Sequence, residues 1–128
     1  EILFPFLRMG QAGSVVDNAG AGGLVASVDS QTGIVETPGR MENGCSSIFH
    51  PDSGAQILGM RVPRWDELRA LSVKLAGIVP EQKYISWDFA LTDSGWVVVE
   101  SNCAGQFVCP QLTTRQGIRD RLHPYFGI

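Results

Sequence analysis

Long apolar runs, closely spaced cysteine pairs and an excess of positive charge are all missing from this sequence. It has no run of about eighteen apolar residues, so we expect no transmembrane helix. The three cysteines include no Cys-x-x-Cys pair, which argues against a disulfide framework or a zinc site and favours reduced thiols in a cytoplasmic protein. The formal net charge of −3 argues against nucleic acid or an anionic membrane as the main partner.

What remains is ordinary globular composition. The chain has 128 residues, of which 44% are hydrophobic and 18% charged, enough for one domain with its own core. We therefore expect a single domain over residues 1–128. The chain opens on Glu1 rather than Met and carries no charged-then-apolar leader, so we expect it to be a segment of a longer protein.

The pattern of apolar residues and turn formers predicts an α+β fold with a largely antiparallel sheet and flanking helices. Residues 1–9 have extended character, and Pro5 limits them to an edge or bulged strand. Residues 63–79 are the clearest helix, because their apolar side chains recur on one face. The other expected elements are strands at 24–29, 34–37, 84–91 and 96–102, an irregular stretch at 38–59 and a short helix at 113–122.

The two strands near the C-terminal end form a hairpin around Gly95. If its loop has three residues with Gly95 in the left-handed conformation, a common form, then Leu91 pairs with Val97 and Asp88 pairs with Glu100. Because side chains alternate between the faces of a strand, we expect Glu100 and Asn102 to share a face with Val98 and Trp96.

Two carboxylates directly opposite each other destabilise a sheet unless something neutralises them. A divalent cation does so, and Asp88, Glu100 and Asn102 offer the hard oxygen donors that magnesium prefers. The alternative is that Asp88 and Glu100 are solvated on an exposed face, because a slip of one residue in the register separates them. The hairpin alone leaves both interpretations open.

Several motifs in order give the chain a resemblance to a known family. The stretch from Lys83 to Leu91 and then Gly95 to Asn102, which ends in Glu-x-Asn, resembles the closing strands of ATP-grasp enzymes. Further motifs are similar to the sugar-transfer-associated subgroup of that family. They are Phe6-Leu7-Arg8-Met9-Gly10, Ser14 to Asn18 with Gly22-Gly23, His50 to Gly54, and Val62 to Glu67.

The resemblance implies the C-terminal lobe of an ATP-grasp fold whose N-terminal ATP-binding half is absent from this chain. It implies a ligase that uses ATP to activate a small carboxylate as an acyl phosphate, which an amine or similar nucleophile then attacks. Asp88, Glu100 and Asn102 match the family's ligands for Mg²⁺ or Mn²⁺, which bridge the ATP phosphates. The subgroup's name associates the chain with polysaccharide biosynthesis. The chain alone is expected to be inactive.

Four further residues are candidates for contacts to substrate. Arg8 is expected to contact phosphate or the acyl intermediate, unless it is a surface residue at a strand end. Asp17 and Asn18 precede glycines and place backbone amides near an anion, unless they form a plain turn. His50 is a candidate substrate contact, with a structural or solvated role as the alternative.

Two other functions stay open beside the ligase. The chain is alternatively a non-catalytic binding module that retains the fold, or a different metal-dependent phosphoryl-transfer enzyme that uses the same oxygen ligands. The sequence departs from related ligases at Ser86, where an arginine is common, and at Cys103-Ala104-Gly105, where Ser-Pro-Gly is common. Both departures concern the acceptor chemistry and leave the three metal ligands in place.

Overall fold

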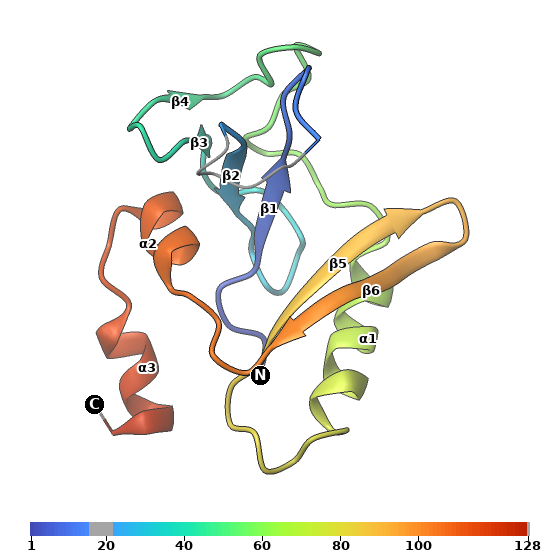
Figure 1. Cartoon of the computed structure of the whole chain (residues 1–128), viewed down its shortest axis with the longest axis vertical. Coiled ribbons are helices and arrows are strands. Elements are labelled where there is room, and N and C mark those ends of the chain that lie inside the picture. The colour runs from blue at the N-terminus through green and yellow to red at the C-terminus, as the bar shows by residue number, and fades with distance from the viewer. Residues whose placement is uncertain (16–21, 128) are drawn as a thin grey trace. The chain divides into compact units, whose positions relative to one another are not determined.

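A computed structural model describes residues 1–15 and 22–127. These residues form three helices and six strands (Figure 1), and the chain divides into two compact units. The first unit comprises Glu1–Ile2 and Arg64–Gln106, and the second comprises Leu3–Pro63 and Phe107–Ile128. The predicted α+β class with antiparallel strands is confirmed. That residues 1–128 form one domain, and that the N-terminal ATP-binding half of the fold is absent from them, both stay predictions.

The first unit contains one helix and one two-stranded sheet. Strands β5 (Ser86–Thr92) and β6 (Gly95–Asn102) form an antiparallel hairpin, close to the two strands that the sequence predicts. The indole of Trp96 donates a hydrogen bond to the carbonyl oxygen of Arg64, at 3.2 Å. Arg64 is the residue before helix α1 (Trp65–Ala76), so this bond fastens the hairpin to the start of the helix.

Helix α1 confirms the predicted helix but is shorter than residues 63–79. It begins after Arg64, which has a left-handed φ of 55°, and it ends at Gly77. Asp66 and Glu67 lie in its first turn and Lys74 in its last, the arrangement that the helix dipole favours. The predicted apolar face holds at its start, where Trp65 and Leu68 are buried. It fails at Ile78, which is 63% exposed because Gly77 has already ended the helix.

The second unit is built on a four-stranded sheet in the order β1-β2-β3-β4, with antiparallel neighbours throughout. The strands are β1 (Phe6–Met9), β2 (Leu24–Ser27), β3 (Gly39–Arg40) and β4 (Ser46–Ser47). The prediction of an edge strand after Pro5 is confirmed, because β1 pairs only with β2 in this sheet. Strand β2 is central, and its residues Leu24, Val25 and Ala26 are at most 1% exposed.

The segments after β2 are less regular than strands. The expected return strand at 34–37 is reduced to two isolated antiparallel bridges among the described residues, Val28 with Val35 and Ile34 with Arg61. Between residues 38 and 59 the predicted irregular stretch is confirmed except for the two-residue strands β3 and β4. Ile57 from this stretch is 1% exposed, so the irregular backbone still contributes to the core.

The predicted helix at 113–122 is wrong, because two shorter helices lie there. They are α2 (Val108–Thr114) and α3 (Arg119–Phe126). Arg115 adopts a left-handed φ of 55° and donates its backbone N–H to the carbonyl of Gln111 at 2.8 Å, which ends α2. The interruption between α2 and α3 lets the two helices pack separately. Helix α2 buries Thr113, and α3 buries Leu122 beside Phe4 and Ile118. Among the described residues, no helix is long and apolar enough to cross a membrane.

Candidate functional site

The β5–β6 hairpin places the two acidic residues opposite each other. Asp88 pairs with Glu100 across the strands, and Ser86 pairs with Asn102. The predicted Asp88–Glu100 pair is therefore confirmed. The predicted Leu91–Val97 pair is wrong, since Leu91 pairs with Trp96.

The acidic pair forms despite a different turn. Thr92 pairs with Gly95, so the loop between the strands has two residues rather than the expected three, and this shifts the register by one residue near the turn. A β-bulge then follows between the Phe89–Val98 pair and the Asp88–Glu100 pair, with Val99 as the extra residue. A bulge sets two residues of one strand against one of its partner, so it returns Glu100 to the position opposite Asp88.

The bulge also changes which side chains share a face. Paired residues lie on the same face and neighbours in a strand alternate, so Asp88, Glu100 and Asn102 lie together with Ser86. Val98 pairs with Phe89 and Trp96 pairs with Leu91, which places both on the other face. The expectation that Glu100 and Asn102 share a face with Val98 and Trp96 is therefore wrong. Trp96 turns its indole to Arg64, so the acidic face is the one opposite this attachment to α1.

Hydrogen bonding couples Asn102 to Glu100. The amide nitrogen Nδ2 of Asn102 donates to Oε1 of Glu100 at 3.1 Å. This bond fixes the amide with its nitrogen toward the carboxylate and presents its oxygen Oδ1 as a further acceptor. Glu100 and Asn102 are exposed and Asp88 is half-buried, so the site faces solvent within its unit.

The donor set is small. Among residues 1–15 and 22–127, no group of three or more His, Cys, Asp and Glu side chains is placed to hold a metal ion. The hairpin offers two carboxylates and one amide oxygen instead. Magnesium is often held by one or two carboxylates, with water and substrate phosphates completing its shell. The site fits a cation that it shares with a phosphate ligand, rather than one that the protein encloses.

The chain that follows Asn102 folds back onto β5. A Cβ atom at Gly105 would overlap Oγ of Ser86 and lie 2.7 Å from its Cβ, with Cε1 of Tyr84 at 3.5 Å. Only a glycine permits this approach. Ser86 is the residue paired with Asn102, so the contact with Gly105 fixes the loop 103–105 beside the acidic face. Sequence reasoning noted Ser86 and Gly105 separately and missed their contact, which no local pattern signals.

The anchoring of the hairpin to α1 involves a second set of charged residues. Arg64 donates from Nε to Oε1 of Glu67 at 2.9 Å, and its guanidinium lies 3.3 Å from the position that a Cβ on Gly95 would occupy. Hydrogen bonding to Arg64 lowers the pKa of Glu67, and the same contact raises the pKa of Arg64. The tip of the hairpin is thereby placed against the first turn of the helix.

The other predicted site residues belong to the second unit. Arg8 lies on β1 opposite Val25 and is half-buried. His50 makes contacts to the backbone from both ring nitrogens: Nε2 to the carbonyl of Gly10 at 2.8 Å, and Nδ1 to the amides of Asp52 and Ser53 at 3.3 and 3.4 Å. These bonds show His50 holding its own loop against the end of β1. Asp17 and Asn18 lie outside the described residues.

Asp52 reinforces the same junction and was not singled out from the sequence. Its Oδ2 accepts the backbone N–H of Ala12 at 2.7 Å. His50 and Asp52 therefore tie the loop at 50–54 to the turn that follows β1. An aspartate two residues after a histidine, in a loop that also contains proline and glycine, is a recognisable turn pattern, but its distant partner is not readable from that pattern.

Comparison with known proteins assigns the class of the chain. The model of the family described as sugar-transfer associated ATP-grasp matches residues 1–125. The chain belongs to this family, which places it among ATP- and nucleotide-binding proteins that generally use ATP with Mg²⁺. Searches of the curated proteins and of the solved structures found no significant match.

Proposed function

We propose that this chain is the C-terminal lobe of an ATP- and Mg²⁺-dependent carboxylate ligase, with Asp88, Glu100 and Asn102 as the ligands of the metal. The observation that carries the proposal is the register of the hairpin, which sets Asp88 opposite Glu100. The choice of ATP as the nucleotide rests on membership of the ATP-grasp family. The N-terminal ATP-binding half would come from outside residues 1–128, and the chain would be inactive without it.

Electrostatics supports the assignment of the ligands. Two carboxylates on directly opposed positions of one sheet face repel each other. Mg²⁺ or Mn²⁺ offsets such repulsion and binds both carboxylate and amide oxygen. Arrangement on one rigid hairpin, rather than on separate loops, keeps the ligands in place before the cation arrives.

The reaction has two steps that together consume one ATP. An oxygen of the substrate carboxylate attacks the γ-phosphorus, the bond to ADP breaks, and an acyl phosphate forms. An amine then attacks the acyl carbon, and inorganic phosphate leaves with its bonding electron pair. The metal supplies charge neutralisation for the phosphoryl group in transfer.

The residues of this chain bind and orient rather than react. Asp88 and Glu100 hold the phosphate end of the nucleotide through the cation, and Asn102 orients Glu100 through their hydrogen bond. Arg8 contacts phosphate or the acyl intermediate, since a guanidinium matches the geometry of these anions. Asp17, Asn18 and His50 remain candidates for substrate contacts. A cytoplasmic location and a role in polysaccharide biosynthesis belong to the same proposal.

Binding of Mn²⁺ tests the ligand assignment directly. Mn²⁺ replaces Mg²⁺ at oxygen sites and broadens the NMR signals of nearby nuclei. We expect selective broadening of Asp88, Glu100 and Asn102, and its loss in Glu100→Gln, which keeps the shape of the side chain but removes the charge. Glu81→Gln is the matched control, because Glu81 is an exposed glutamate of the same unit outside the hairpin. Equal broadening in native protein and Glu100→Gln would contradict the assignment.

Nucleotide binding and turnover separate the ligase from the alternatives. Calorimetric titration with Mg·ADP is expected to show binding that Glu100→Gln weakens about tenfold, the equivalent of about 1.4 kcal/mol. ATP consumption that requires both a carboxylate and an amine, with the N-terminal half supplied, supports the ligase. Consumption without an amine supports another phosphoryl-transfer enzyme, and no consumption or binding supports a non-catalytic module.

A further inference from the structure

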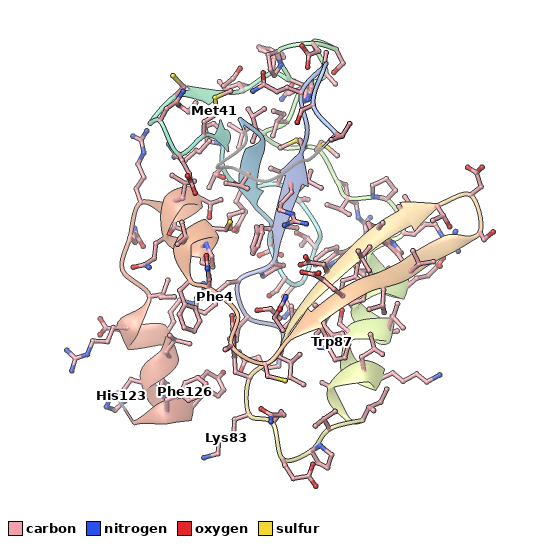
Figure 2. The ribbon with its side chains drawn as sticks, viewed as in Figure 1. Phe4, Met41, Lys83, Trp87, His123 and Phe126 are labelled. Atoms are coloured by element: carbon pink, nitrogen blue, oxygen red, sulfur yellow. The ribbon has the colours of Figure 1, made fainter. Side chains whose placement is uncertain are left out.

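The second unit contains a cavity that the proposed ligase chemistry does not use. Its volume is about 160 Å³, and its walls come from the end of β2, the turn after it, and helices α2 and α3. Phe4, Val28 and Pro110 are buried residues that supply an apolar wall. Phe4, labelled in Figure 2, packs with Ile118 and Leu122 of the α3 segment, so this wall belongs to a core cluster.

Hydrogen-bond acceptors dominate the rest of the lining. Glu36, Thr113 and Thr114 lie in the lining. Asp29 lies there too, but its Oδ1 already accepts from the backbone N–H groups of Gln31 and Thr32 and from the Thr32 hydroxyl. Both threonine hydroxyls of the lining donate to the carbonyl of Pro110, at 3.0 and 2.7 Å, so they offer only lone pairs to a ligand. A ligand here therefore has to bring donors, and the carboxylate of Glu36 favours a donor with positive charge.

Arg121 gives the cavity one cationic wall. Its guanidinium carbon lies 4.3 Å from the centroid of the Phe4 ring, on the face of that ring. A stacked guanidinium is held by the ring while its N–H groups remain directed outward in the plane. Such a group suits a carboxylate on the ligand. The lining thus combines the anionic Glu36, the cationic Arg121 and an apolar wall in a single small space.

We propose that this cavity binds a compact amino acid, with its ammonium group toward Glu36 and its carboxylate toward Arg121. The size agrees with this ligand, because a cavity of about 150 Å³ accommodates benzene, and L-alanine has as many non-hydrogen atoms. A ligand this small, in a site where Glu36 and Arg121 are exposed, binds with a Kd on the order of 1 mM. This site is separate from the proposed metal ligands and does not depend on them.

Three related ligands test the two charge contacts, of which L-alanine and L-lactate are equal in size and ethylamine is smaller. L-alanine carries both charges, L-lactate replaces the ammonium by a hydroxyl, and ethylamine lacks the carboxylate. They are titrated into the full chain without nucleotide or metal, and backbone amide NMR shifts locate the site. We expect L-alanine to shift Val28, Thr113 and Thr114 saturably, and L-lactate and ethylamine to bind about tenfold more weakly. Equal binding of all three, or saturable shifts located elsewhere, would overturn the proposal.

Two variants assign the contacts to residues. Glu36→Gln is expected to weaken L-alanine about fivefold or more and to leave L-lactate unchanged, because only the ammonium contact is lost. Glu42→Gln is the matched control, an exposed glutamate of the same unit outside the cavity lining. Arg121→Gln is expected to weaken L-alanine and leave ethylamine unchanged. An effect of Glu36→Gln no larger than that of Glu42→Gln refutes the ammonium contact. These titrations contain no ATP or metal, so absence of amino-acid binding leaves the ligase proposal untouched. Failure of the ligase proposal likewise leaves the amino-acid site untouched.

Discussion

The contact between Gly105 and Ser86 supports a quantitative prediction about the loop beside the acidic face. Gly105→Ala adds a Cβ that would overlap Oγ of Ser86 and lie 2.7 Å from its Cβ. Oγ can rotate away, but Cβ is fixed to the backbone of β5, so the loop or the start of β5 has to move. Overpacking of this kind costs about 1–3 kcal/mol of unfolding free energy.

A second substitution shows whether that contact is the cause. Ser86→Gly removes both overlapping atoms and leaves only Cε1 of Tyr84, at 3.5 Å. Alone it costs about 0.5–1 kcal/mol, because glycine weakens a strand. In the double variant the overlap is gone, so we expect a favourable coupling energy of about 1–2 kcal/mol between the two sites. Ser86→Ala in place of Ser86→Gly retains the Cβ and is expected to rescue only in part.

The assay follows from the position of the tryptophans. All three, Trp65, Trp87 and Trp96, lie in the unit that contains the hairpin, so their fluorescence during urea unfolding reports on that unit. Gly77→Ala is the control, because its φ is −81° and the added Cβ meets Lys74 at an ordinary 3.5 Å. Additive effects of Gly105→Ala and Ser86→Gly, or equal costs for Gly105→Ala and Gly77→Ala, would refute the reasoning.

Two further predictions concern the junctions of each unit. Hydrogen bonding to Arg64 lowers the pKa of Glu67 below its ordinary 4.5, so the pair stabilises the fold above that value and loses its effect as the pH falls through the lowered pKa. The difference in unfolding free energy between native protein and Glu67→Gln should therefore shrink on acidification, and a difference that stays constant with pH contradicts this. In the second unit, His50→Ala leaves the carbonyl of Gly10 and the amides of Asp52 and Ser53 without their ring partner. We expect a loss of about 1–2 kcal/mol, seen as faster amide hydrogen exchange around Gly10 and residues 50–54, and unchanged exchange there would show that the ring bonds contribute nothing.

Local patterns predicted the elements that depend on local chemistry. The predicted helix at 63–79 lies within two residues of α1 at its start and three at its end. The acids in its first turn and the apolar side chains at Trp65 and Leu68 carry that prediction. Pro5 correctly indicated an edge strand, since proline has no N–H to donate to a second neighbour. Glycine near position 95 correctly indicated the hairpin.

The errors arise where the deciding contact is distant in sequence or where a residue adopts an uncommon conformation. A left-handed φ at Arg115 ends α2, and arginine gives no sign of it in a sequence. The packing of Leu122 with Phe4 joins residues from opposite ends of the chain, and no local pattern reveals such a contact. The spacing of apolar residues alone was therefore compatible with one helix that continued through 115–118. The contact of His50 with Gly10 was likewise unreadable from the sequence, because the two residues are forty positions apart.

The hairpin shows why a correct pairing still required the structure. A two-residue loop without any bulge would continue the register from Phe89–Val98 to Asp88–Val99, which sets Glu100 opposite Trp87. Glu100 would then lie on the face of Trp96, and the two carboxylates would lie on opposite faces without repulsion. The extra residue Val99 prevents this separation. The irregular strand therefore places two like charges opposite each other. Bulges occur often beside functional sites because they re-aim side chains. Here the bulge returns Glu100 to the face of Asp88, which is the arrangement that the proposed metal site requires.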